Sequence, residues 1–319
     1  MDVDIIDFLI LDGRSTTRQI AQGIGLRENT VAQRLKRLME RDIVRVRAAI
    51  DWRTAGFTAS HLLFLRVEDR PVREVITEIY DLPHQTQSAC RVFGSVDIIT
   101  RVLAPDLAGV AEHVEHGLGS IEGVSVVLAL PEVATYKHPN NFHAVPPLDV
   151  EVPALPDPPI PLDELDRSLV KLLVHDARSP WRQVARQLDV SESTVRARVR
   201  RLEDSGLVRL IAQIDPISAG ADVEYAWIGV RVRDGRRADV VRLLVTQADV
   251  NEVSTTVGPY DVLAFVGVRS PRRLARILDD LRGVGGASTT DAWAVSTVTM
   301  SGFPWIRFEG LLSSVHQGP

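Results

Sequence analysis

Two arginine-rich segments of the chain have the composition to bind a nucleic-acid backbone. Between residues 27 and 47, seven basic side chains stand against three acidic ones, a local balance of +4. Between residues 191 and 209, five arginines stand against three acids, a balance of +2. A guanidinium group can pair with phosphate oxygens and can reach guanine edges in a DNA groove. These segments therefore predict binding to double-stranded DNA, although the whole chain carries a net charge of −5.

Helical periodicity decides which of these side chains face outward. Val195, Val199 and Leu202 recur at helical spacing and predict the buried face of one helix. Ser191 is expected to cap its start and Gly206 its end. The candidate DNA contacts are the polar side chains on the outward arc or near the start of each helix: Asn29, Thr30, Gln33, Arg34 and Arg37 in the first segment, and Ser193, Thr194, Arg196, Arg200 and Arg201 in the second. The alternative interpretation is a helix with an ordinary solvated face.

A second pair of motifs has the composition to hold a small ligand. Gly94-Ser-Val-Asp97 and Gly258-Pro-Tyr-Asp261 lie at corresponding places in the sequence. Glycine lets backbone N–H groups approach a carboxylate, and an aspartate accepts hydrogen bonds from an ammonium group. The candidate effector-binding residues are Gly94, Asp97, Gly258, Pro259, Tyr260 and Asp261. The alternative is a strand-to-strand turn in which each aspartate binds local backbone donors.

These correspondences come from a tandem duplication with an offset of 164 residues. Between residues 12 and 51, seventeen of forty positions are identical to those 164 residues further on. Eight prolines between residues 138 and 161 predict a semi-stiff linker between the first copy, before it, and the second copy, after it. We expect the two copies to form a pseudo-dimer within one chain. Pairing swapped between two chains is the alternative.

Each copy predicts an α+β unit, in which a (winged) helix-turn-helix precedes a ferredoxin-like βαββαβ domain. The predicted helix-turn-helix domains span residues 1–47 and 162–211, and the ferredoxin-like domains span 48–137 and 212–305. The linker occupies 138–161 and a tail 306–319. A βαββαβ sheet has one apolar face without helices, which must be covered. This predicts self-association through the ferredoxin-like domains, and hence a homo-oligomer.

Composition argues against several other classes of protein. The longest apolar stretch, Val124–Leu130, is too short to span a bilayer, and the N-terminus lacks the apolar run of a secretory signal. The single cysteine, Cys90, fits a reducing cytoplasm and is expected in the core rather than as a nucleophile. His113 and His116 lie one helical turn apart, but a solvated helix face explains them better than a metal site. No catalytic residue, metal or cofactor is predicted.

The second copy strongly resembles the Lrp/AsnC (feast/famine) transcriptional regulators. The resemblance lies in the stretch that begins Leu165-Asp-Arg-Ser-Leu-Val, in Asp176-Ala-Arg-Ser and in residues 190–208. Gly258-Pro-Tyr-Asp261 resembles the same family's amino-acid-sensing domain. The first copy departs from the pattern, because it lacks the glycine that ends the basic helix of the second copy, Gly206, and the tyrosine of the loop, Tyr260. The resemblance covers nearly the whole chain apart from the linker and tail.

The resemblance implies a cytoplasmic, nucleoid-associated transcription factor that responds to a small effector, typically an amino acid. It also implies that a strand joins each helix-turn-helix to its sensing domain, and that the sensing domains pair through their sheets. Two alternatives stay open. Sirohaem decarboxylases look like fused Lrp/AsnC units, but the loops found here are acidic, whereas a tetrapyrrole polycarboxylate calls for a basic pocket. The other alternative is a chromosome-organising protein that binds DNA with little sequence preference.

Overall fold

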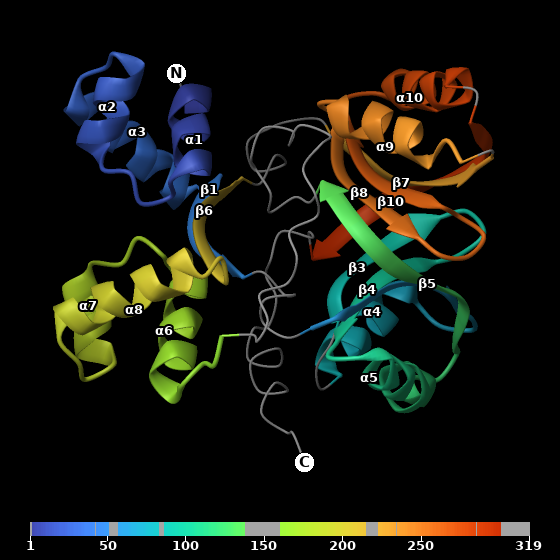
Figure 1. The fold of residues 1–319 in the computed structure, drawn as a ribbon, viewed down its shortest axis with the longest axis horizontal. Helices are drawn as coiled ribbons and strands as arrows, with labels where there is room; N and C mark the ends of the chain where they lie inside the picture. Colours follow the sequence, from blue (N-terminus) through green and yellow to red (C-terminus); the bar gives the residue numbers. More distant parts are fainter. Residues whose placement is uncertain are drawn as a thin grey trace. The chain divides into compact units, whose positions relative to one another are not determined.

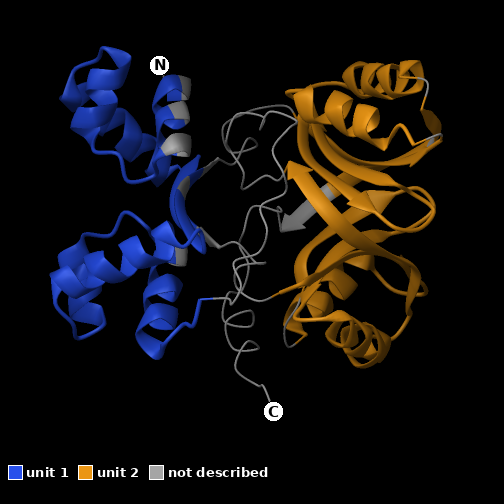
Figure 2. Ribbon diagram, viewed as in Figure 1, with its two compact units in different colours: residues 1–56, 155–222 blue, residues 57–154, 223–319 orange. Residues whose placement is uncertain are grey.

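The computed structural model describes residues 2–41, 43–50, 57–82, 86–137, 160–214, 223–233, 235–284 and 286–300. Nearly all of the predicted linker, and the predicted tail, lie outside these residues. The chain divides into two compact units (Figure 2). Unit 1 comprises Met1–Gly56 and Leu155–Asp222, and unit 2 comprises Phe57–Ala154 and Val223–Pro319. Each unit therefore combines the two copies within a single chain, as the pseudo-dimer hypothesis predicts.

Unit 1 holds two three-helix bodies, each followed by a strand, and this confirms the predicted helix-turn-helix in both copies. The first consists of α1 (Asp2–Leu11), α2 (Thr17–Ile24), α3 (Glu28–Glu40) and β1 (Val44–Ile50). The second consists of α6 (Glu164–His175), α7 (Trp181–Gln187), α8 (Glu192–Asp204) and β6 (Val208–Ile214). Ser191 caps α8 by accepting a hydrogen bond from Thr194 N, as predicted, whereas Arg27 makes no side-chain cap at α3.

Strands β1 and β6 pair antiparallel and join the two bodies (Figure 1). At the centre of the register Arg47 faces Ile211, which lies 164 residues further on and is its equivalent. Val44 faces Ile214 and Ile50 faces Val208, so the same positions meet in reversed order. This is an isologous contact, in which each copy presents the same surface to the other. The two helix-turn-helix bodies are thereby related by a pseudo-twofold axis.

Unit 2 contains the βαββαβ pattern twice, as predicted. In the first copy it consists of β2 (Ala59–Val67), α4 (Val72–Asp81), β3 (Thr86–Phe93), β4 (Ile98–Ala104), α5 (Leu107–Glu112) and β5 (Val124–Lys137). In the second it consists of β7 (Glu224–Val232), α9 (Arg237–Thr246), β8 (Val250–Thr256), β9 (Val262–Val268), α10 (Pro271–Gly283) and β10 (Ala287–Met300). In Figure 1, α4 and α5 cover the outer face of one sheet and α9 and α10 that of the other.

The eight strands close into one barrel in the order β10-β3-β4-β2-β5-β8-β9-β7. The copies meet at two equivalent places, the β5–β8 junction and the β3–β10 junction. Aromatic and aliphatic side chains of both copies, among them Phe64, Trp227, Phe265 and Trp293, form one core inside the barrel. The apolar sheet faces for which the sequence predicts self-association are thus covered within one chain, because each sheet buries the other.

Three elements differ by more than two residues from the ranges that hydrophobic periodicity predicts, namely strands over Val124–Leu130 and Trp293–Met300 and one helix over Asp106–His116. Strand β10 begins six residues earlier than predicted, at Ala287. The pattern predicts a strand that ends at Leu130, but β5 continues to Lys137 because residues 132–137 pair with β8 of the other copy. The pattern also predicts one helix from Asp106 to His116, but α5 ends at Glu112 and a π-helical turn follows at His113–Gly117. This turn places His113 in the interior, 5% exposed. Among the described residues, no helix combines the length and apolar character needed to cross a bilayer.

Candidate nucleic-acid interface and ligand loops

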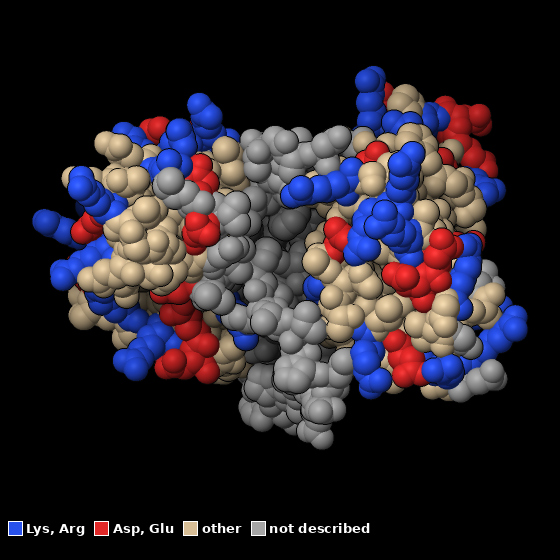
Figure 3. Space-filling view, turned by 90° about the horizontal axis from the view of Figure 1, so that it is seen from above, with Lys and Arg blue, Asp and Glu red and all other residues tan. Residues whose placement is uncertain are grey.

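Helices α3 and α8 each bury one face and leave the opposite face open. Val31, Leu35 and Leu38 are buried on α3, and Val195, Val199 and Leu202 occupy the equivalent positions on α8. Asn29 and Gln33 of α3 are exposed, and so are Ser193, Arg196, Arg200 and Arg201 of α8, while Thr30, Arg34 and Thr194 are half-buried. In Figure 3, Lys and Arg side chains stand out along the outer edge of unit 1. The third helix of each body therefore presents polar side chains to solvent.

Three of the predicted DNA-contacting arginines are held by an acid of the first helix. Asp2 accepts from Arg34 at 2.7 Å and from Arg37 at 3.3 Å. The equivalent Asp166 accepts from Arg198 at 3.2 Å and from Arg201. Each of these arginines reaches back 32 or 35 residues to the first helix of its own body. The charges of Arg34, Arg37 and Arg201 are thus partly balanced within the protein.

Other cations on the same helices are more available to a ligand. Arg200 is 85% exposed, and its contact with Asp204 is long, at 3.7 Å. Lys36, the equivalent residue on α3, is 75% exposed. Arg196 is 60% exposed and pairs with Glu192 one turn earlier at 2.6 Å. A solvent-exposed ion pair of this kind contributes little to stability, so these side chains can change partner at small cost.

The start of α8 carries a small hydroxyl cluster. Ser191 Oγ lies 2.7 Å from both Ser193 Oγ and Thr194 Oγ1, and it also accepts from Thr194 N. On α3 the equivalent residues are Arg27, Asn29 and Thr30, and the cap hydrogen bond is missing. The two helix starts therefore offer different hydrogen-bonding groups to a ligand.

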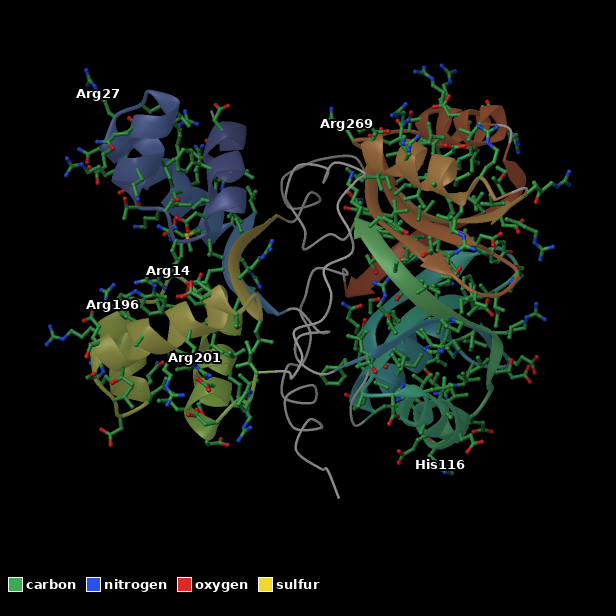
Figure 4. All side chains as sticks on the ribbon, in the orientation of Figure 1. Arg14, Arg27, His116, Arg196, Arg201 and Arg269 are labelled. Carbon is green, nitrogen blue, oxygen red and sulfur yellow. The ribbon has the colours of Figure 1, made fainter. Side chains whose placement is uncertain are left out.

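Three further exposed basic residues lie on the helix-turn-helix bodies and are not among the predicted DNA contacts. Arg18 on α2 and Arg182 on α7 are exposed and occupy equivalent positions. Arg27, at the start of α3, is also exposed, and in Figure 4 it points outward from unit 1, as Arg196 does. The retention of Arg18 and Arg182 in both copies is the sequence signal that could have identified them.

Arg14 and Arg178 connect the two helix-turn-helix bodies reciprocally. The guanidinium of Arg14 donates to the carbonyls of Ala177 and Ser179, and that of Arg178 donates to the equivalent carbonyls of Gly13 and Ser15. Arg14 also lies over the ring of Trp181, 3.5 Å from its centroid. Figure 4 shows Arg14 between the two bodies. This reciprocal contact, together with the β1–β6 pair, sets the relative placement of α3 and α8.

Both predicted ligand loops are closed turns with a shared construction. Gly94 and Gly258 have φ values of +137° and +139°, which favour glycine. Asp97 accepts a hydrogen bond from Val67 N at 2.9 Å, and Asp261 accepts one from Val232 N at 2.7 Å. One carboxylate oxygen of each aspartate thus binds a backbone donor at the end of a neighbouring strand, β2 or β7, rather than a local donor of its own turn. The assignment of these aspartates to an effector stays a prediction.

The side chains of the second loop pack against the barrel. Tyr260 donates to Asp291 at 2.6 Å, and its ring meets that of Trp293 edge-on at 5.4 Å. Burial and the hydrogen bond to Asp291 raise the pKa of Tyr260 above its ordinary value. The Pro259 carbonyl accepts from Arg231 at 2.9 Å. Trp293 in turn donates to Ser95 Oγ at 3.1 Å, so β10 of the second copy holds the loop of the first.

Among the described residues, His113 and Cys90 are buried, whereas His116 is exposed. Within the part of the chain that the structure describes, no three His, Cys, Asp or Glu side chains are placed to share a metal ion. Burial lowers the pKa of His113 to about 4, whereas His116 is exposed. Cys90 is buried, as predicted, and burial raises its pKa to about 11, so the thiol is protonated and unreactive at neutral pH.

Comparisons with known proteins identify relatives of each copy. Residues 162–203 match the AsnC-type helix-turn-helix domain, and residues 1–45 match a winged helix-turn-helix DNA-binding domain. A stretch of 137 residues is 31% identical to the HTH-type transcriptional regulator FL11 of Pyrococcus horikoshii, covering 43% of this chain and 90% of that protein. An uncharacterized HTH-type transcriptional regulator of Pyrococcus furiosus, PF1231, is 33% identical over 144 residues, covering 44% of this chain and 97% of that protein.

A solved structure matches the chain over its full length. The siroheme decarboxylase NirDL, in complex with an iron-uroporphyrin III analogue, aligns with a TM-score of 0.65. The alignment covers 99% of this chain and 100% of that chain, at 15% sequence identity. This likeness shows that the two proteins share a fold.

Proposed function

The chain belongs to the Lrp/AsnC-type helix-turn-helix family and carries the family's unit twice, and from this premise we propose that it is a sequence-specific DNA-binding transcriptional regulator. One observation carries the proposal: β1 and β6 pair through equivalent residues, so that α3 and α8 form a pseudo-twofold pair inside unit 1. We call α3 and α8 the reading helices, since in this proposal they contact the bases. A twofold pair of such helices matches the near-palindromic symmetry of an operator, with half-sites about one helical turn apart or a multiple of it.

The two reading helices differ where they would face bases, which predicts an imperfect palindrome. Gln33 and Lys36 on α3 correspond to Ala197 and Arg200 on α8. A glutamine can bind adenine through two hydrogen bonds, whereas an alanine offers only an apolar contact, for example to a thymine methyl group. One half-site is therefore expected to specify bases that the other does not. A requirement for a strictly symmetric operator would argue against this.

We further propose that a small effector, an amino acid by family resemblance, modulates DNA binding from the loops at Gly94–Asp97 and Gly258–Asp261. The second loop supports this better, since it presents Tyr260, Arg231 and Asp291 together. In the first loop Ser95 and Val96 replace Pro259 and Tyr260, and Val96 is buried. As a regulator of this kind the protein would act in the cytoplasm, at the nucleoid. The predicted homo-oligomer, which would consist of two or more such closed chains, is also part of this proposal.

The decarboxylase alternative has the shared fold in its favour, but the ion pairs of one arginine in the barrel interior argue against it. Binding a tetrapyrrole polycarboxylate needs basic groups that are free to pair with its carboxylates. Arg101, which faces the barrel interior, is already bound by Glu132 and Glu252. We therefore favour the regulator. Incubation with sirohaem and detection of released CO₂ tests the enzyme directly, and turnover would overturn our preference.

A mobility-shift assay on DNA upstream of the protein's own gene tests the main proposal. Specific binding should persist against a large excess of bulk DNA, whereas a chromosome-organising protein would be displaced in proportion to the competitor. Repeating the assay with each of the twenty amino acids tests for an effector. Alanine in place of Asp291 or Tyr260 should weaken the response without changing effector-free DNA binding. Failure to retain any upstream fragment under competition would contradict the regulator.

A further inference from the structure

A buried ion cluster lies inside the barrel beside the β5–β8 junction. Arg101 of β4 donates to both carboxylate oxygens of Glu132 in β5, at 2.8 and 2.9 Å. The same guanidinium donates to both carboxylate oxygens of Glu252 in β8, one of them at 3.2 Å. The three side chains are only 5%, 1% and 4% exposed, respectively. Their charges therefore depend on one another rather than on water.

Neighbouring polar groups complete the cluster. Gln87 accepts from Arg101 at 3.2 Å, and Ser60 donates to Glu132. Burial favours a raised pKa for the Glu132 carboxyl, but the charge of Arg101 and the hydrogen bonds from Ser60, Arg101 and Ser254 outweigh it and hold the pKa below its ordinary value. Glu132 is therefore ionised at neutral pH and forms a true ion pair with Arg101.

The cluster occurs at only one of the two equivalent junctions. The residues 164 positions away from Arg101, Glu132 and Glu252 are Phe265, Ser296 and Ser88. Phe265 stacks on Tyr225, with ring centroids 5.3 Å apart and an interplanar angle of 3°. Where the first copy places a cation, the second copy thus places an uncharged aromatic pair.

The two copies contribute unequal charges to the cluster. The first copy supplies Arg101 and Glu132, which neutralise each other. The second copy supplies Glu252, whose ion-pair partner is Arg101 of the first copy. A buried carboxylate that loses its partner is strongly destabilising, because desolvation is no longer offset by attraction. The second copy therefore depends on the first for a charge that it cannot balance with its own counterpart residue.

We propose that Glu252 makes the barrel face of the second copy specific for the first copy and prevents two second copies from pairing. In a pair of second copies, each Glu252 would lie opposite Phe265 and Ser296 instead of Arg101 and Glu132. A pair of first copies would keep both Arg101–Glu132 ion pairs and place Ser88 where Glu252 now lies. First-with-second pairing gives both buried carboxylates of the cluster a guanidinium partner. This proposal does not depend on DNA binding.

The experiment measures pairing between the two copies after the linker is cut. A protease site is inserted between Val145 and Pro146, and the folded, cleaved protein is unfolded in urea, refolded and analysed by native mass spectrometry. Pairing without preference would give about a quarter second–second pairs, the statistical share for two interchangeable partners. For the natural sequence we expect second–second pairs to stay below about 1%, because each of them would bury Glu252 carboxylates without a guanidinium partner.

Two variants separate the proposal from a general effect on the cluster. Glu252→Ser copies Ser88 and is expected to raise second–second pairs at least about tenfold, since no buried carboxylate then lacks a partner. Glu132→Ser is the matched control, because it removes the other glutamate from the same arginine and yet should leave second–second pairs as rare as before. Glu252→Gln replaces the serine variant if that protein does not refold. Abundant second–second pairs in the natural sequence, or an equal rise for the Glu132 variant, would overturn the proposal.

Discussion

In unit 1 the two copies preserve the same contacts at equivalent positions, whereas in unit 2 the same duplication has diverged. Asp2 and Asp166 each bind two arginines of the third helix, and Arg14 and Arg178 reach equivalent carbonyls. In the barrel, Arg101 corresponds to Phe265 and His113 to Ile277, and all four side chains are buried. The backbone pairing is retained in both units. In the barrel the two copies differ in the polarity of the side chains that they bury.

This difference indicates two distinct demands on the molecule. A pair of reading helices must keep a regular spacing to fit a regular double helix, so contacts that set the spacing stay symmetric. The barrel must keep its two copies together, and unequal buried charges serve that purpose because they specify which surfaces meet. The following four changes test how far this contrast holds.

The largest expected effect concerns the acid that holds the third helix. Asp166→Asn should lower the free energy of unfolding of α6–α8 by about 3–4 kcal/mol, since Asp166 is fully buried and binds both Arg198 and Arg201. Asp2→Asn should cost less than about 1 kcal/mol in α1–α3, because the side chain of Asp2 is 35% exposed. Amide hydrogen exchange measures both. Equal losses would show that the two bodies are more alike than their burial indicates.

The next effect concerns pH and the buried histidine of the first copy. His113 has a pKa of about 4, below the unfolded value of 6.5, so the unfolded chain binds the proton first. Its contribution to stability is therefore complete above pH 6.5 and is lost as the pH falls toward 4, with a loss of about 2 kcal/mol by pH 5. His113→Ile copies Ile277 and should remove this part of the pH dependence. Urea unfolding at pH 7.5 and pH 5 provides the measurement, and an unchanged difference would refute it.

A smaller effect is expected from the reciprocal arginines. Arg14→Ala should cost about 1–2 kcal/mol of unit 1 stability and Arg178→Ala somewhat less, because only Arg14 also stacks on an aromatic ring. DNA affinity is then measured on operators whose half-sites are moved apart by single base pairs. The double variant should flatten the dependence on spacing. A uniform loss at every spacing would assign these residues a purely structural role.

The smallest effect concerns individual cations on the reading helices. Lys36→Ala and Arg200→Ala should each weaken DNA binding by about 1 kcal/mol and reduce the slope of log affinity against log salt by about 1. Arg201→Ala should change that slope less, because Arg201 already pairs with Asp166. Titrations at several salt concentrations compare the three. A larger change for Arg201 would mean that its ion pair opens when DNA binds.

The sequence predicted the local architecture well because the relevant forces are local. The structure confirms the helical spacing of Val195, Val199 and Leu202, the cap at Ser191 and the βαββαβ order. Each of these features rests on residues that lie a few positions apart in the chain. The outward direction assigned to Arg34 and Arg201 was only partly informative. Each side chain leans toward an aspartate on the first helix, and a helical wheel of one segment does not include that partner.

By itself, the sequence determined the duplication and the type of nearly every element, since both follow from order and periodicity along the chain. Its motifs carried the resemblance to the family. Only the tertiary structure decided that the two sheets close into one barrel, that β5 extends to pair with β8 of the other copy, and that Arg101 binds Glu252 across 151 positions. The physical reason is that hydrophobic periodicity specifies which face must be buried but not what buries it. The choice of partner depends on directional contacts between residues far apart in the chain, and these exist only once the chain has folded.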